Sequence, residues 1–150
     1  MNLPERFDLT CINEKGEKER IVMIHCAIMG SIERFSAVLI EHLAGNFPLW
    51  LAPEQVRIVP VTDAHNEYAT EVYSLLKEAK LRVVLDDASE SMGKKIRAAK
   101  TEKLPYFIVI GDQEVSDRTV TLEKRDGTKE VLDLMNLTTK LTAEVHQRGL

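Results

Sequence analysis

The first third of the chain switches from an alternating to a helical pattern of apolar residues. Apolar and polar residues alternate from Arg6 to Ile12, as they do in a strand with one buried face. A polar turn containing glycine then leads to the β-branched run 21–25, so the two runs are predicted to form a hairpin. From Ser31 to Gly45 the spacing predicts a helix with one apolar face, formed by Ile32, Phe35, Val38, Leu39 and Leu43.

From residue 54 onward, predicted strands alternate with predicted helices. Short apolar or alternating runs predict strands, at 55–62, 81–85, 106–110, 119–123 and 130–132. Apolar residues at helical spacing predict helices between and after them, beginning at Asp63, at Ser89 or Ser91, and at about Asn136. In the second of these helices we expect three residues to point inward, Met92, Ile96 and Ala99. This order predicts an α/β fold, a mixed and roughly five-stranded sheet flanked by helices and preceded by a β-hairpin and a helix.

Glycine and proline add local detail to this pattern. Pro60 lies inside a predicted strand, which suggests an edge position or a bulge. Gly111 and Asp112 are expected to turn the chain, and Asp126-Gly127 predicts a hairpin between the last two strands.

The apolar segment 47–53 is the expected boundary between two parts, residues 1–50 and residues 54–150. The second part is large enough to fold alone. A lone hairpin is marginal in water, so the first part is expected to belong to a larger antiparallel sheet.

Composition narrows the class of protein. With 44% hydrophobic and 29% charged residues, the chain can bury a core and is not of the disordered class. Its net charge of −4 argues against nucleic-acid binding by overall positive charge, although a local basic face would suffice. The two cysteines make neither a disulfide framework nor a CxxC site. No signal peptide or membrane-length apolar run is evident, so a cytoplasmic protein is expected.

Two residues near the predicted turn at Gly30 could carry chemistry. Arg34 lies in the first turn of a helix, where a guanidinium can contact a phosphate or stack on a purine. The spacing alone favours a plain surface pair with Glu33. His25 lies in an apolar run, and one histidine is more often structural than a metal ligand, because a zinc site needs about three or four ligands.

The second half offers a possible RNA-binding surface. The segment 94–103 holds five cations and one acid, which suits either a phosphate-facing surface or an ordinary solvated helix face. Glu114, just beyond an apolar strand, could accept hydrogen bonds from a base edge or be an exposed loop acid. Tyr106 and Phe107 are expected to be core residues.

These residues, in this order, resemble the bacterial threonyl-tRNA synthetases, which are class II aminoacyl-tRNA synthetases. The resemblance extends over essentially the whole chain. It is carried by Leu3–Leu9, Val22–His25, Gly30–Phe35, Leu39–His42, Phe47–Pro53, Thr62-Asp63, Gly93, Lys95–Arg97, Pro105-Tyr106, Gly111-Asp112 and Glu114-Val115.

The resemblance implies that residues 1–50 are the end of the class II catalytic domain, with its third signature motif, and that residues 54–150 are the anticodon-binding domain. It gives Arg34 a contact with ATP, and it makes His25 one of three ligands of a zinc ion. The other two ligands and signature motifs 1 and 2 are absent from this chain. Zinc and ATP with magnesium are therefore expected for the parent enzyme, while this chain alone is expected to hold none of them and to be inactive.

The resemblance also implies that the second part binds the anticodon stem-loop of threonine tRNA, through Arg97, Glu114, Lys103 and Ser89. The sequence departs from the family at Cys26, where arginine is usual, and at 89–91, where Asn-Glu-Lys is usual. The family has a basic residue at position 123, and Glu123 is expected to repel phosphate there.

Three interpretations remain open at this stage. The first is the C-terminal part of a threonine–tRNA ligase, dimeric in the parent enzyme and monomeric as this chain alone, without membrane association. The second is a free-standing tRNA-binding or regulatory module related to the anticodon domain, without ligase activity. The third is self-association through the exposed edges of the first hairpin.

Overall fold

The computed structural model describes residues 2–88 and 90–149, so Ser89 lies outside the described residues. The chain divides into two compact units, Met1–Leu39 and Ile40–Leu150. The division falls inside helix α2, Ile32–Leu43. The presence of α2 confirms the helix predicted between Ser31 and Gly45. This helix ends where Ala44 and Gly45 adopt positive φ angles of 49° and 75°, a backbone conformation that terminates helices.

The first unit contains a short helix and a two-stranded hairpin. Helix α1, Leu3–Arg6, begins with proline in its first turn, a position that proline favours. Strands β1, Thr10–Ile12, and β2, Lys18–Arg20, pair antiparallel. The prediction of a hairpin is confirmed. Its first strand is shorter than the predicted run 6–12, and its second strand lies before the predicted run 21–25.

The run 21–25, predicted as the second strand, has no regular secondary structure. Val22 and Ile24 are 79% and 84% exposed. A strand needs a neighbour to satisfy its backbone hydrogen bonds. Pairing in the described first unit ends with Thr10 opposite Arg20 and one further bond from the Ile21 N–H to the Leu9 carbonyl. The β-branched residues therefore have strand propensity without a sheet to join.

The second unit is built on a five-stranded mixed sheet with the order β4-β3-β5-β6-β7. The first three strands of this unit are parallel, and β6 and β7 run antiparallel to their neighbours. The predicted sheet is thus confirmed, with strands β3 Val56–Pro60, β4 Val83–Leu85, β5 Tyr106–Ile110, β6 Thr119–Lys124 and β7 Lys129–Asp133.

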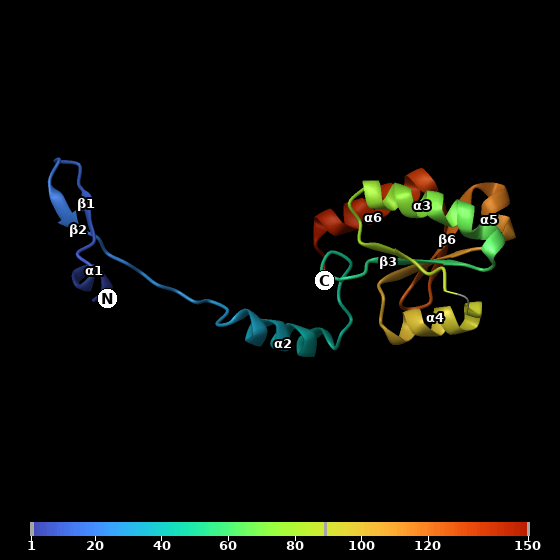
Figure 1. Ribbon diagram of the computed structural model, residues 1–150, viewed down its shortest axis with the longest axis horizontal. Coiled ribbons are helices and arrows are strands. Elements are labelled where there is room, and N and C mark those ends of the chain that lie inside the picture. The colour runs from blue at the N-terminus through green and yellow to red at the C-terminus, as the bar shows by residue number, and fades with distance from the viewer. Residues whose placement is uncertain (1, 89, 150) are drawn as a thin grey trace. The chain divides into compact units, whose positions relative to one another are not determined.

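Helices cover the two faces of this sheet (Figure 1). Helices α3, Asn66–Glu78, and α6, Leu134–Gln147, lie on one face, and α4, Met92–Thr101, lies on the other. The larger core lies under α3 and α6, and it includes the fully buried Ile58, Val72, Ile108, Leu137 and Leu141. A smaller core under α4 contains Ala99, Leu104 and Phe107.

The structure corrects four local predictions. Asp63 does not cap α3 directly but begins a 3₁₀ turn, Asp63–His65. The predicted turn at 111–112 leads into a helix, α5, Asp112–Asp117. Helix α6 begins two residues before Asn136, because Asp133 accepts a hydrogen bond from the Asn136 N–H. Met92 is 39% exposed rather than inward, since it occupies the first turn of α4.

Pro60 lies in the interior strand β3, where proline is uncommon. The neighbouring β4 pairs only with Val56–Ile58. The N–H of Val61 is directed to Ile110 of β5, so the alternation of the strand points the missing N–H of Pro60 toward the side where β4 has already ended. Proline therefore removes no ladder bond.

The predicted boundary segment 47–53 lies inside the second unit and packs on its core. Leu49 and Ala52 are buried, and the carbonyl of Leu49 accepts a hydrogen bond of 2.8 Å from the buried Gln55 side chain. The Gln55 amide oxygen accepts a second bond of 2.8 Å from the Arg82 N–H. One side chain thus ties the boundary segment to the start of β4.

Candidate nucleic-acid interface

The face of the sheet that carries α4 is only partly covered. Phe107 and Val109 of β5 lie under α4, and their cross-strand partners on β6 are Glu123 and Thr121. Directly opposed residues share a face of the sheet, so Glu123 and Thr121 lie on the α4 side. On β7 this face continues with Lys129 and with Val131, which is 65% exposed.

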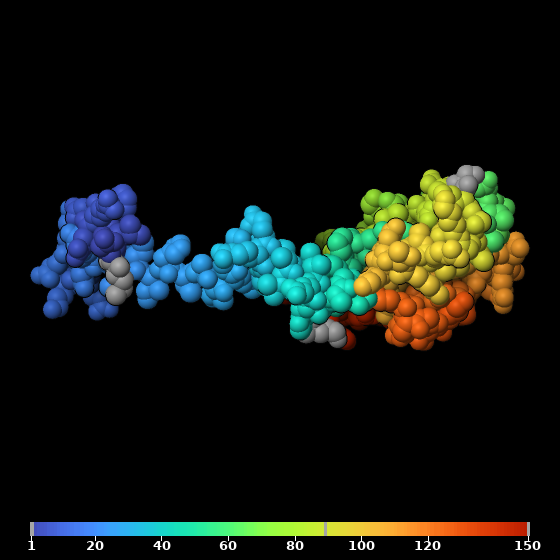
Figure 2. Space-filling view, turned by 90° about the horizontal axis from the view of Figure 1, so that it is seen from below, coloured from blue at the N-terminus to red at the C-terminus, as the bar shows by residue number. Residues whose placement is uncertain are grey.

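We call the strip formed by Thr121, Glu123, Lys129 and Val131 the β6–β7 strip. Figure 2 views this side of the sheet, with α4 in yellow and the β6–β7 hairpin in orange beside it. A shallow, open sheet surface bordered by a cationic helix is a suitable platform for single-stranded RNA.

Three cations of α4 form a row with helical spacing, Lys94, Arg97 and Lys100. Lys100 reaches Glu123 of β6 at 2.9 Å and so faces the β6–β7 strip, whereas Lys94 pairs with Glu90 at 2.5 Å. Arg97 is exposed and borders a surface hollow with Ser91, Gly93 and Lys94. No ion pair or hydrogen bond with another described residue holds its guanidinium, which leaves all five N–H donors available.

Glu114 lies where the carboxyl end of β5 passes into α5. Its Oε2 accepts a bond of 2.9 Å from the Gly111 N–H, and its Oε1 accepts one of 2.7 Å from the Thr121 hydroxyl. Burial by itself would raise the pKa of Glu114, but these two hydrogen bonds favour the charged form and hold its pKa below the ordinary value. The carboxylate is therefore fixed beside the β6–β7 strip, with lone pairs left for a ligand.

The substitution Glu114→Gln is expected to make stability less dependent on pH. A carboxyl with a lowered pKa stabilises the fold above its unfolded pKa, and this contribution is lost as pH falls through the folded pKa. Thermal melting should show the wild type above the variant near neutral pH, with the difference closing below the ordinary pKa of 4.5. Glu67→Gln, an exposed change on α3, is the control. A difference that stays constant with pH would contradict this expectation.

Glu123 does not present an open negative charge, contrary to the expectation of phosphate repulsion. It is 3% exposed, and its carboxylate pairs with Lys100 at 2.9 Å and with Lys129 at 3.3 Å. The buried acid is thus covered by two ammonium groups.

Two other cations of the segment 94–103 are engaged away from the strip. Lys95 is 5% exposed, and its ammonium donates to the Asp86 carbonyl at 2.7 Å. Lys103 follows the C-terminal end of α4, and its ammonium donates to the Ala44 carbonyl at 2.6 Å. Glu114 therefore borders the strip through Thr121, Arg97 is exposed on α4, and Lys103 lies beyond the C-terminal end of α4.

A polar link through His65 at the carboxyl edge of the sheet was not predicted from the sequence. His65 is 4% exposed, and its Nδ1 accepts a bond of 3.2 Å from the Thr62 N–H. The other ring nitrogen, Nε2, then carries the proton and donates to Asp112 at 2.9 Å. This bond fixes the loop after β3 to the start of α5, the helix that carries Glu114.

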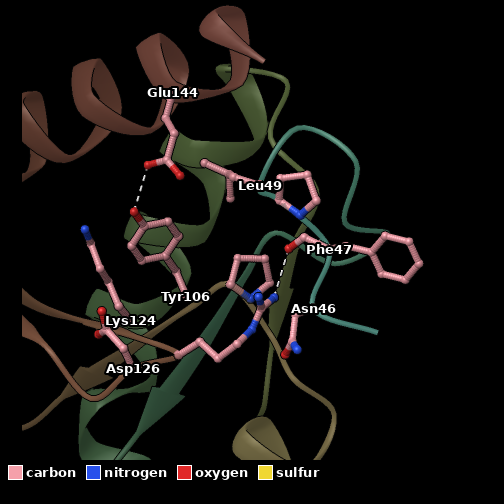
Figure 3. Close-up of a pocket in the computed structure, with 10 residues that line it drawn as sticks. Asn46, Phe47, Leu49, Tyr106, Lys124, Asp126 and Glu144 are labelled. Atoms are coloured by element: carbon pink, nitrogen blue, oxygen red, sulfur yellow. Dashed lines mark hydrogen bonds between the residues drawn. The ribbon is translucent and has the colours of Figure 1, made fainter. Parts of the chain in front are cut away.

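A hollow of about 490 Å³ lies at the opposite, amino edge of β5 (Figure 3). Its polar groups largely pair with one another. The Tyr106 hydroxyl donates to Glu144 at 2.7 Å, and Arg125 donates to the Phe47 carbonyl at 2.9 Å. Both predicted core aromatics, Tyr106 and Phe107, are buried, so neither serves as a stacking platform.

Two residues of the first unit, Arg34 and His25, have a predicted chemical role. The guanidinium of Arg34 packs over Gly30, whose φ of 67° suits glycine, and the two border an open apolar hollow with Ile28 and Phe35. His25 is exposed. Within residues 2–88 and 90–149, no three His, Cys, Asp or Glu side chains gather to hold a metal. These residues alone do not fit a zinc ion, and His25 could supply only one ligand.

No helix in the described ranges is both long enough and apolar enough to span a bilayer.

The chain is similar to threonine–tRNA ligases over nearly its whole length. It is 47% identical over 149 residues to threonine–tRNA ligase of Caldanaerobacter subterraneus subsp. tengcongensis, covering 99% of this chain and 23% of that protein. It is 50% identical over 150 residues to the enzyme of Carboxydothermus hydrogenoformans, covering 97% of this chain and 23% of that protein. The chain thus spans about a quarter of the length of the curated relatives it matches.

Solved structures show the same architecture. The RNA binding domain of threonyl-tRNA synthetase from Cryptosporidium parvum Iowa II matches with a TM-score of 0.83 and 36% identity, over 95% of this chain and 36% of that chain. Prolyl-tRNA synthetase from Cryptosporidium parvum, at 23% identity, matches with a TM-score of 0.70 over 98% of this chain and 33% of that chain, and shares the fold. A model of the anticodon binding domain matches residues 55–144. The resemblance stated from sequence is confirmed, and the chain belongs to the anticodon binding domain family.

Proposed function

We propose that this chain is the C-terminal, anticodon-binding part of a threonine–tRNA ligase, and that it binds the anticodon stem-loop of threonine tRNA. The observation that carries the proposal is the open β6–β7 strip between the cations of α4 and the fixed carboxylate of Glu114. Single-stranded loops are recognised by splayed bases that meet hydrogen-bonding side chains on such surfaces.

The side chains of this site would make different kinds of contact with RNA. Arg97 has a planar fork that can donate two parallel hydrogen bonds to a base edge or a phosphate. Glu114 can accept from an exocyclic amine, because its pKa keeps it charged. Lys103 and Ser89 are the remaining proposed contacts. Lys103 would have to exchange its bond to the Ala44 carbonyl for one to RNA, and Ser89 lies outside the described residues.

The complete enzyme, in this proposal, joins threonine to its tRNA with ATP and magnesium in the cytoplasm. Arg34 would contact ATP and offset charge that develops on phosphate, and His25 would supply one of three ligands to zinc. The enzyme would be a dimer. The present chain alone is expected to be a monomer in light scattering and to support no threonine-dependent ATP–pyrophosphate exchange, since it carries neither the other motifs nor the other ligands.

The test is a fluorescence titration of the whole chain with a threonine tRNA transcript and with a non-cognate tRNA transcript, at stated salt concentrations. Tighter binding of the threonine tRNA is expected. Competition by its isolated anticodon stem-loop, and not by its acceptor stem, should locate the contact. Equal affinity for both tRNAs, or competition by the acceptor stem, would refute the proposed function.

A further inference from the structure

Glu123 is a buried acid with two cationic partners from separate elements. Lys100 comes from α4 and Lys129 from β7, and both ammonium groups lie within 3.3 Å of the same carboxylate. The Glu123 side chain is 4% exposed, whereas those of Lys100 and Lys129 are 49% and 63% exposed. The acid is therefore shielded from solvent, while both lysines remain open to it.

The Lys100 ammonium is also held by an aromatic ring. It lies 5.8 Å from the centroid of Phe107, which is 1% exposed, within the range of a cation–π contact. A lysine normally loses considerable side-chain entropy when it is fixed on a ligand. Here the carboxylate and the ring fix its position before any ligand arrives.

We propose that Lys100 and Lys129 form a phosphate-contacting pair, and that buried Glu123 sets both the position and the charge of this pair. Two ammonium groups and one carboxylate leave a net charge of +1, which matches one backbone phosphate. Without Glu123 the two lysines would move independently and carry +2, which strengthens attraction to any RNA. Glu123 is thus a positioning residue. It lowers the attraction of the lysine pair to any RNA and fixes where a phosphate binds on the β6–β7 strip.

This inference rests on the proposed function, because the register it describes is that of RNA on the β6–β7 strip. It adds two lysines to the proposed contacts and one acid that positions them. It also gives the departure at position 123 a role, since the acid lies under the surface and supports the cations above it.

The first test removes both lysines from the whole chain, as Lys100→Ala/Lys129→Ala. The plot of log affinity against log salt concentration should flatten by about one, because the pair together with Glu123 carries a net charge of +1 and neutralises one backbone phosphate. The control is Lys77→Ala/Lys80→Ala, which removes the same charge around the C-terminal end of α3 and should leave the slope unchanged. An equal change in slope for both double variants would overturn the proposal.

The second test is Glu123→Gln, with Glu78→Gln on α3 as the matched loss of one negative charge. Binding of the non-cognate tRNA should tighten severalfold, and the preference for threonine tRNA should fall. Urea unfolding of each variant distinguishes this from a structural role, which would lower stability and leave the preference intact. A preference unchanged from the wild type would overturn the positioning role. If the wild type itself prefers neither tRNA, the proposed function fails, and the lysine pair is decided by the salt slopes alone.

Discussion

Replacing Arg97 with alanine is expected to weaken binding of threonine tRNA by about tenfold or more, the usual effect of losing an arginine that contacts a base. Arg97 is exposed on α4, three residues before Lys100, which pairs with Glu123 of the β6–β7 strip. No described residue engages its guanidinium, so its removal should cost little stability. The measurement is a titration of the whole chain with the tRNA, accompanied by urea unfolding.

Arg97→Lys separates charge from geometry. Lysine keeps the positive charge and lacks the planar fork, so it should restore the salt dependence of binding and little of the preference for threonine tRNA. Lys80→Ala, at the end of α3, is the control for loss of one positive charge. A tRNA affinity that is the same for wild type and Arg97→Ala would remove Arg97 from the site.

Replacing Gln55 with leucine is expected to destabilise the second unit by about 1 to 4 kcal/mol, the cost of leaving one buried carbonyl and one partly buried N–H without partners. Gln55 is 1% exposed and joins the Leu49 carbonyl to the Arg82 N–H. Leucine has a similar volume, so the loss would come from hydrogen bonds and not from a cavity. Urea unfolding measures the change.

The control for this prediction is Gln113→Leu on α5. Gln113 is exposed, so the same substitution should change the free energy of unfolding by at most about 0.5 kcal/mol. A loss below about 1 kcal/mol for Gln55→Leu would mean that water or backbone movement satisfies both groups. The boundary segment would then be less firmly tied to β4 than its geometry indicates.

The hydrophobic pattern was most informative where strands have both faces covered. The almost wholly apolar run 106–110 became the central strand β5, and the helical spacing before Gly45 became α2. The pattern failed at 21–25, where strand-forming residues have no described partner. β-Propensity expresses fit to a neighbouring strand and to a packed face, so composition alone could not reveal that neither is present.

The sequence predicted the residue types of the candidate site better than their surroundings, because burial and long-range contacts are not visible in local patterns. Arg97 and Glu114 were named from the resemblance, and their contact with RNA stays a prediction; the structure shows Glu114 bonded to Thr121 of the β6–β7 strip and Arg97 exposed on α4. Lys95 had the same charge as its neighbours in sequence, but its position on α4 turns it inward to Asp86. His65 had no signal, because its link to Asp112 joins residues 47 positions apart in sequence.

The sequence by itself determined the alternation of strands and helices, the membership of an anticodon-binding family and the residue types available for RNA. Those features depend on local periodicity and on motifs that are contiguous in the chain. Only the tertiary structure decided which charges are open to a ligand. Whether Glu123 is open to phosphate or pairs with two lysines depends on side chains of α4 and β7 both reaching β6, an arrangement that no local pattern encodes.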